Sequence, residues 1–183
     1  MQATGGASLT GDAATQATGG RRRVGVLLAV AATIVILDQI SKVVAVATLQ
    51  DGAVVEVIDG ILELRLVRNP GAAFSFATGM TGLFTAIAVA VIIVILGLSR
   101  RVTSVPWAIA FGGLLGGAVG NLVDRVLREP APFRGHVVDF LELPNWPVFN
   151  LADSVIVGSA VLMAWLSVRG VAYDGAEPGR EGG

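Results

Sequence analysis

The sequence contains no cysteine and, among its 183 residues, a single histidine, His136. The absence of cysteine excludes a disulfide framework, thiolate metal ligands and a cysteine nucleophile. One imidazole makes histidine-based catalysis or a histidine-rich metal site improbable. We therefore expect neither a metal ion nor an organic cofactor.

Charge is also scarce. Charged residues make up 15% of the chain, whereas 54% of it is hydrophobic, and the formal net charge is -1. So few charges cannot provide the polar surface of a water-soluble domain, and the composition indicates a membrane protein. The basic residues are scattered along the chain, so no surface for binding nucleic acid is expected.

Long apolar segments are abundant. Each is close to the ~20 residues that a helix needs to cross a bilayer. The sequence therefore predicts an all-α membrane protein with four transmembrane helices and with both chain ends on one side. Arginines near the segment ends are more numerous on the side of the termini, which favours cytoplasmic termini. The four segments are 24–49, 80–98, 105–127 and 149–168.

The ends of the chain differ from its middle. Residues 1–20 lack apolar periodicity and are expected to form a disordered cytoplasmic tail, and residues 170–183 a flexible C-terminal tail. The membrane domain would then span residues 21–169. An alternative remains for the first apolar segment, since its three leading arginines and the "AVA" at 45–47 resemble a cleavable secretory signal.

Two connections contain short β-prone runs. In "AVVEVIDGILELRLVRN" at 53–69, two such runs flank Asp59-Gly60, which predicts a hairpin. A further strand is expected in "GHVVDFLELPNWP" at 135–147. Both connections follow helices that lead to the outer side, so a small β-rich extracytoplasmic layer is predicted.

Two aspartates stand near the ends of apolar segments. Asp124 lies near the end of the third segment and Asp153 near the start of the fourth, so their depths match in neighbouring antiparallel helices. A carboxylate inside a membrane segment costs ~3 kcal/mol and is a functional candidate. Two close carboxyl groups share a proton, so one can act as base and the other as acid, as in aspartic proteases. Alternatively, each caps a helix or pairs with Arg125, Arg128 or Lys42 at the membrane interface.

Asp38 and Lys42 stand four residues apart, so they share one helix face and can form an ion pair. The pair could also orient groups around the two aspartates or contact a substrate headgroup. Ser41 does not face Lys42 and is not expected to act as a nucleophile with it.

Small residues at four-residue spacing, Gly112, Gly116 and Gly120, predict close packing of the third helix against a neighbour. His136 and Asp139 have no distinguishing pattern by composition, and we interpret them as polar residues on a strand or loop.

Five motifs in order, with four apolar segments between them, resemble the bacterial lipoprotein signal peptidases, or signal peptidase II. Members of that family are intramembrane aspartic proteases. The resemblance extends over about residues 24–168 and leaves both tails unexplained. The motifs are "LDQISK" at 37–42, "RNPGAAFS" at 68–75, "GNLVDR" at 120–125, "GHVVDF" at 135–140 and "FNLAD" at 149–153.

The resemblance implies an endopeptidase of the bacterial cytoplasmic membrane whose active site is near the outer leaflet. It would remove the signal peptide of diacylglyceryl-modified prolipoproteins just before the lipidated cysteine, with Asp124 and Asp153 as catalytic residues. Its partners would be these prolipoproteins and membrane lipids, and the protein would be a monomer. A cleavable first segment fits less well, because "LDQISK" would then be lost. Residues expected to bind substrate or support the catalytic pair are Asp38, Lys42, Asn69, Asn121, Arg125 and Asn150.

Two other classes of function are open to the same residues. A transporter or channel component could use Asp38, Asp124 and Asp153 as a proton or cation relay. The clustering of these carboxylates on one side argues against a pathway across the bilayer. A non-catalytic assembly factor, held by its glycine-rich helix face, would tolerate Asp→Asn changes at 124 and 153.

Overall fold

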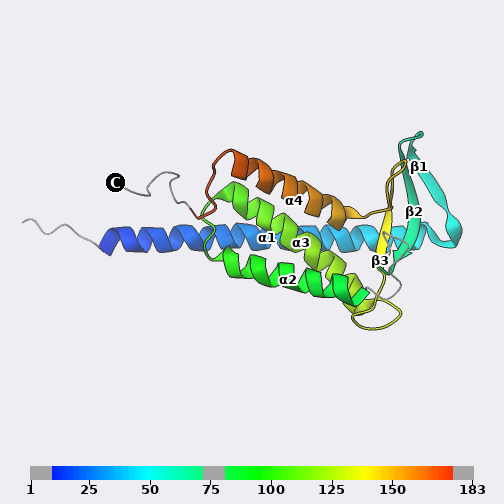
Figure 1. Ribbon diagram of the computed structural model, residues 1–183, viewed down its shortest axis with the longest axis horizontal. Helices are drawn as coiled ribbons and strands as arrows, with labels where there is room; N and C mark the ends of the chain where they lie inside the picture. The colour runs from blue at the N-terminus through cyan, green and yellow to red at the C-terminus, as the bar shows by residue number, and fades with distance from the viewer. Residues whose placement is uncertain (1–9, 72–80, 175–183) are drawn as a thin grey trace, which may run out of the picture.

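A computed structural model describes residues 10–71 and 81–174 of the chain. Four helices run side by side along the long axis of the molecule, and a small sheet lies across one end of them (Figure 1). The first helix begins and the last helix ends at the opposite end. The elements are α1 (Thr10–Thr48), a 3-10 turn (Gln50–Gly52), β1 (Val54–Ile58), β2 (Leu62–Asn69), α2 (Thr81–Ser99), α3 (Val105–Leu127), β3 (Val137–Glu142) and α4 (Leu151–Val168).

The four-helix prediction is confirmed. Within the described residues, four helical stretches are long and apolar enough to cross a membrane: Arg23–Thr48, Thr81–Ser99, Val105–Leu127 and Leu151–Val168. The last of these starts at Leu151 because the Asn150 side chain caps it, accepting a hydrogen bond from the main chain of Asp153. The chain is therefore a mostly helical, multi-pass membrane protein.

The predicted β layer is a three-stranded antiparallel sheet in the order β1-β2-β3. The hairpin turns at Gly60, whose φ of 64° is in the left-handed region that glycine adopts readily. An apolar cluster joins the sheet to the C-terminal end of α1, with Ala45 and the following Leu49 packed against Val138 and Phe140 of β3. The sheet is thereby fixed to this end of the bundle.

Helix α3 lies at the centre of the bundle and contacts each of the other three helices. Its glycines allow close approach on two faces. A Cβ atom at Gly116 would lie 2.8 Å from the carbonyl oxygen of Ala31 on α1, and one at Gly117 would lie 2.8 Å from that of Ala152 on α4. The predicted packing role of the glycines is confirmed, and a second neighbour is added to it.

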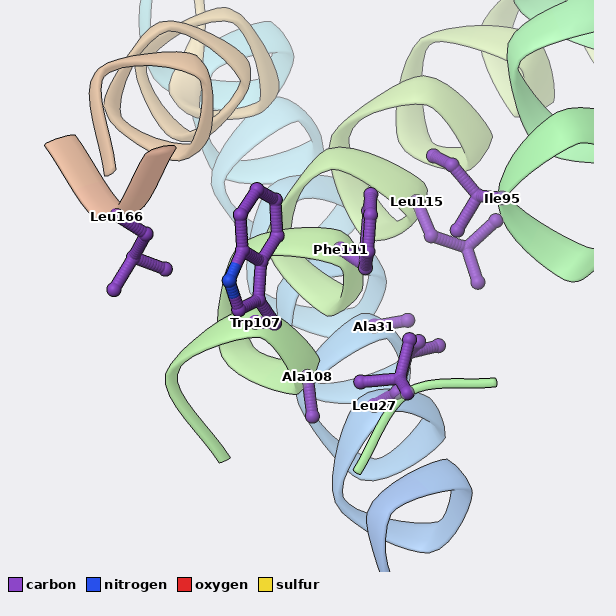
Figure 2. Packing of buried hydrophobic residues seen from close by; sticks show 9 residues of the cluster. Leu27, Ala31, Ile95, Trp107, Ala108, Phe111, Leu115 and Leu166 are labelled. Atoms are coloured by element: carbon purple, nitrogen blue, oxygen red, sulfur yellow. The ribbon is translucent and has the colours of Figure 1, made fainter. Parts of the chain in front are cut away.

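The apolar core lies in the half of the bundle remote from the sheet. Figure 2 shows Leu27 of α1, Ile95 of α2, Leu166 of α4 and two aromatic residues of α3, Trp107 and Phe111. The two aromatic rings are tilted against each other with their centroids 5.4 Å apart. All four helices thus contribute to one core.

Both expected tail boundaries differ from the structure. Helix α1 begins at Thr10, before the expected boundary at residue 21. After α4 the chain turns back, and Trp107 Nε1 donates a hydrogen bond to the carbonyl of Val171 (2.7 Å). The main-chain NH of Thr103 donates to the carbonyl of Tyr173 (2.9 Å). These hydrogen bonds hold the main chain of Val171 and Tyr173 against Trp107 and Thr103. Residues 1–9 and 175–183 lie outside the described residues.

Candidate active site at the sheet end of the bundle

The site residues predicted from the sequence gather where the helices meet the sheet. Within the described residues, hydrogen bonds and ion pairs link them into a cluster, and Arg125 lies beside it. Residues 72–80, which include the second half of the "RNPGAAFS" motif, lie outside the described residues. Four elements supply the side chains: Asp38 and Lys42 come from α1, Asn121, Asp124 and Arg125 from α3, Asn150 and Asp153 from the start of α4, and Asn69 from the end of β2.

One part of the cluster is a chain of ion pairs. Lys42 Nζ lies 2.9 Å from Asp38 Oδ2 and 3.0 Å from Asp124 Oδ2. Arg128 Nε lies 2.7 Å from Asp124 Oδ1. The side chains of Asp38, Lys42 and Asp124 are fully buried. Two carboxylates are thus balanced by two cations, and the predicted Asp38–Lys42 pair is confirmed. Ser41 donates instead to the carbonyl of Asp38 (2.7 Å).

The same carboxylates also accept hydrogen bonds from main-chain groups. The NH of Ala152, in the first turn of α4, donates to Asp38 Oδ1 (3.0 Å). The NH of Val138 on β3 donates to Asp124 Oδ2 (3.1 Å). Asp38 and Asp124 therefore connect α1, α3, α4 and the sheet. Both oxygens of each carboxylate therefore have partners, and removal of one partner of such a buried charge is strongly destabilising.

A second part of the cluster contains Asp139 and Asp153 and is built around Asn150. Asn150 Nδ2 donates to Asp139 Oδ1 (2.6 Å), and the main-chain NH of Asn150 donates to Asp153 Oδ2 (3.3 Å). Asn69 Nδ2 donates to Asp139 Oδ2 (2.8 Å) and Asn121 Nδ2 to Asp153 Oδ1 (2.8 Å). These donors are neutral amides, whereas the partners of Asp124 include two cations.

Burial raises the pKa of Asp139 to about 6, and the negative charge of Asp153 acts in the same direction. Hydrogen bonds from Asn69 and Asn150 and the charge of Lys42 oppose the increase. Only 1% of Asp139 is exposed. Asp139 therefore keeps its proton at a higher pH than an ordinary aspartate, and it lies close enough to Asp153 for the two charges to interact.

Arg125 lies next to Asp124 in the sequence but is directed to a different environment. Its charge interacts with those of Asp139, Asp153 and Asp124. The guanidinium carbon is 5.6 Å from the centroid of the Phe84 ring. Nη1 is buried and has no hydrogen-bond partner in the part of the chain that the structure describes. An unpaired buried donor beside carboxylates is suited to binding a polar group of a ligand.

Asp139 is the site residue that our sequence analysis missed. We interpreted it as a polar residue on a strand or loop, and the structure places it on β3 between buried apolar neighbours. Two signals were present, because Asp139 is the carboxylate of the "GHVVDF" motif and stands within an apolar run. Arg128, the second cation on Asp124, was considered only as one of several possible partners. Within residues 10–71 and 81–174, no three His, Asp or Glu side chains form a candidate metal site.

The four apolar spans define an integral membrane protein. The buried, hydrogen-bonded carboxylates at one end of these spans are the groups that acid–base catalysis requires. The family model described as Signal peptidase (SPase) II matches residues 30–169. The chain belongs to the signal peptidase II family, whose members are aspartic peptidases.

Curated relatives support this assignment. The chain is 51% identical over 153 residues to the lipoprotein signal peptidase of Mycobacterium avium (strain 104), covering 84% of each chain. It is 46% identical over 172 residues to that of Rhodococcus jostii (strain RHA1), covering 94% of this chain and 86% of the relative. The protein is therefore a peptidase that removes signal peptides from prolipoproteins.

Two solved structures of bacterial membrane enzymes have the same fold. One superposes with a TM-score of 0.71 at 27% identity, over 85% of this chain and 95% of the other. The second gives a TM-score of 0.70 at 29% identity, over 79% and 94%. The arrangement of helices and sheet is thus that of known membrane enzymes.

Proposed function

We propose that this peptidase cleaves diacylglyceryl-modified prolipoproteins just before the lipidated cysteine, and that Asp139 and Asp153 are its catalytic carboxylates. The observation that carries this proposal is the position of Asn150, whose side-chain amide binds Asp139 and whose main-chain NH binds Asp153. One residue therefore holds both carboxyl groups. Among the described residues, the hydrogen-bond donors to these two carboxyl groups are neutral amides, so a proton shared between the two is the natural way to reduce their repulsion.

The chemistry follows from that shared proton. The ionised aspartate accepts a proton from a water molecule as the water attacks the scissile carbonyl carbon. The protonated aspartate donates a hydrogen bond to the carbonyl oxygen and stabilises the tetrahedral intermediate. Transfer of a proton to the leaving amine then completes hydrolysis. Asn69, Asn121 and Asn150 keep the two carboxyl groups oriented throughout these steps.

This proposal revises the sequence-based prediction that Asp124 is the partner of Asp153. Asp124 is fully buried, and its two oxygens face Lys42 and Arg128. Both oxygens of Asp124 are thus engaged in ion pairs with α1 and with the end of α3, which is the arrangement of a structural carboxylate. We assign Asp124, with Asp38 and Lys42, the role of fixing the helices around the catalytic pair. Arg125, whose Nη1 has no hydrogen-bond partner among the described residues, binds the substrate backbone.

We further propose that the sheet end faces the outer leaflet of the bacterial cytoplasmic membrane and that the termini are cytoplasmic. The excess of arginines near the terminal side supports this orientation. The absence of cysteine allows a direct test, because Asp59→Cys in the hairpin and Arg100→Cys at the other end would each be the single thiol. A membrane-impermeant maleimide added to intact cells should label Asp59→Cys alone. Labelling of Arg100→Cys alone would reverse the orientation.

The site needs residues from one chain only, which supports a monomeric enzyme. Its position at the end of the apolar spans fits a substrate whose acyl chains remain in the surrounding lipid, and no partner nucleic acid is expected. Light scattering of the detergent-solubilised enzyme during an active assay would detect a larger assembly.

A gel-shift cleavage assay tests the catalytic assignment. Purified parent enzyme is incubated in detergent with a diacylglyceryl-modified prolipoprotein, beside Asp139→Asn, Asp153→Asn and Asp124→Asn. We expect cleavage by the parent, none by the first two variants, and residual cleavage by the folded fraction of the third. Cleavage by Asp139→Asn, together with an inactive but fully folded Asp124→Asn, would restore Asp124 as the catalytic partner.

A further inference from the structure

Phe84, in the first turn of α2, connects two parts of the site that are distant in the sequence. On one side, its ring lies 5.6 Å from the guanidinium carbon of Arg125 on α3. On the other side, the ring touches the backbone at Gly71, where a Cβ atom would lie 2.8 Å from Phe84 Cδ2. Gly71 has a φ of 108°, so glycine is required there both by space and by conformation.

The turn at Gly71 is itself part of the site. It directly follows Asn69, whose side-chain oxygen accepts a hydrogen bond from the main-chain NH of Gly71 (2.8 Å). Asn69 Nδ2 donates to Asp139. The hydroxyl of Thr81 donates to the carbonyl of Pro70, which attaches the start of α2 to the same turn. The Phe84 ring is thus held by a turn that also orients a proposed catalytic carboxylate.

Arg125 depends on such an aromatic contact more than most arginines do. Its side chain is buried, yet Nη1 has no hydrogen-bond partner among the described residues, so hydrogen bonds at that nitrogen do not fix its orientation. A guanidinium within about 6 Å of a ring centroid gains ~0.5–2 kcal/mol from the ring. The ring also limits the rotamers that the arginine can adopt. Because it forms no conventional hydrogen bond, it leaves the N–H groups of the arginine available to a ligand.

We propose that Phe84 is a positioning residue for substrate binding. Its ring holds the Arg125 guanidinium so that Nη1 is directed at a backbone carbonyl of the substrate beside the scissile bond. This inference rests on the proposed role of Arg125. It predicts that Phe84 acts on substrate affinity only through Arg125, and that an aromatic ring, rather than apolar volume alone, is required at position 84.

The test is a binding cycle in an Asp153→Asn background, in which the affinity for a diacylglyceryl-modified prolipoprotein is measured before any turnover. Phe84→Leu should weaken binding about fivefold, in line with ~1 kcal/mol for one cation–π contact. Phe84→Tyr should bind as the parent does. In an Arg125→Gln background, Phe84→Leu should cause no further loss. Leu83→Ala, on the exposed face of the same turn, is the matched control and should bind as the parent does.

Additive losses in the double variant, or equal losses for Phe84→Leu and Phe84→Tyr, would overturn the proposal and reduce Phe84 to a packing residue. Thermal unfolding of each variant identifies losses that come from misfolding. Should Phe84→Leu fail to fold, Phe84→Met provides the same comparison. Cleavage by the Asp153→Asn protein would overturn the catalytic pair, and the binding cycle would still decide the role of Phe84.

Discussion

Two groups of carboxylates lie at the same end of this bundle, and their surroundings differ. Asp38 and Asp124 alternate with Lys42 and Arg128, so each negative charge has a cation within 3.0 Å. Asp139 and Asp153 are held by neutral amides of asparagine residues. An ion-paired carboxylate has its charge balanced by a cation, whereas two carboxyl groups held by neutral amides can reduce their repulsion by sharing a proton. The difference teaches that burial alone does not identify a catalytic aspartate.

The largest effect should come from removing charge in the amide-held group. Asp139→Asn or Asp153→Asn should lower kcat/KM for prolipoprotein cleavage by at least ~10³-fold, because each removes one partner of the shared proton. The gel-shift assay measures the rate, and thermal unfolding of the same samples should show that the fold is kept. Substantial cleavage by Asp139→Asn would show that Asp139 is not catalytic and that the two groups of carboxylates do not differ in this way.

Removing charge from the ion-paired group should mainly lower stability. Asp124→Asn leaves Lys42 and Arg128 without their common partner, which costs ~3–5 kcal/mol for a buried pair. Chemical denaturation in detergent measures the change in free energy of unfolding. Rescue provides the control. Lys42 keeps Asp38 as a partner, whereas Arg128 loses the carboxylate that it binds, so Asp124→Asn combined with Arg128→Met should recover part of the lost stability. No recovery would mean that Asp124 acts by something other than charge pairing.

The pH dependence of stability gives a further test of the amide-held group, through Asp139. The pKa of Asp139 is raised to about 6 by burial, so the fold favours its protonated form and loses stability as the carboxyl group ionises. The Tm of Asp139→Asn minus that of the parent should therefore increase between about pH 4 and about pH 7, by the equivalent of ~2 kcal/mol. A difference in Tm that is constant over this range would contradict the raised pKa.

A smaller effect is expected from displacing an ion-paired carboxylate while keeping its charge. A Cβ atom at Gly120 would lie 2.6 Å from Asp38 Oδ2. Gly120→Ala should lower the free energy of unfolding by ~1–3 kcal/mol, because the bundle is closely packed at this point. Gly97→Ala, where no atom lies within 4 Å of the added Cβ, is the matched control and should be close to neutral.

The smallest effect should occur at the exposed ion pair of the sheet. Arg65 Nη2 lies 2.5 Å from Glu142 Oε1, but 48% of the arginine side chain is exposed. Arg65→Gln should change the free energy of unfolding by less than ~1 kcal/mol, and less still at high salt. A loss as large as that of Asp124→Asn would show that burial is not what separates the two kinds of ion pair.

The fold could be predicted from the sequence in most of its parts, because helices and strands in a membrane protein follow local patterns. The bounds of α3 coincide with its apolar segment, and both parts of the sheet lie where β-prone runs were found. The packed segment after α4 could not be predicted. It depends on a hydrogen bond between Trp107 and Val171, and nothing in the local pattern of residues 170–174 indicates that contact.

For the site, the sequence predicted which region matters but not how its carboxylates are grouped. Helical depth pairs Asp124 with Asp153, and this reasoning is sound for two helices considered alone. It could not include β3, which brings Asp139 to Asn150. The pairing of Asp124 with Arg128 follows the same four-residue spacing as the Asp38–Lys42 pair and could have been predicted. The partners of a carboxylate are set by tertiary contacts, so spacing along the chain cannot distinguish a paired aspartate from one that exchanges a proton.

The chain segment that returns after α4 also has a practical consequence for purification and imaging. A reporter joined directly after the last membrane helix, at Arg169, would displace Val171 and Tyr173 from Trp107. Such a fusion would expose the base of the apolar core and could be mistaken for an unstable enzyme. Affinity tags and fluorescent proteins should therefore be attached after Tyr173, so that both contacts with Trp107 are kept.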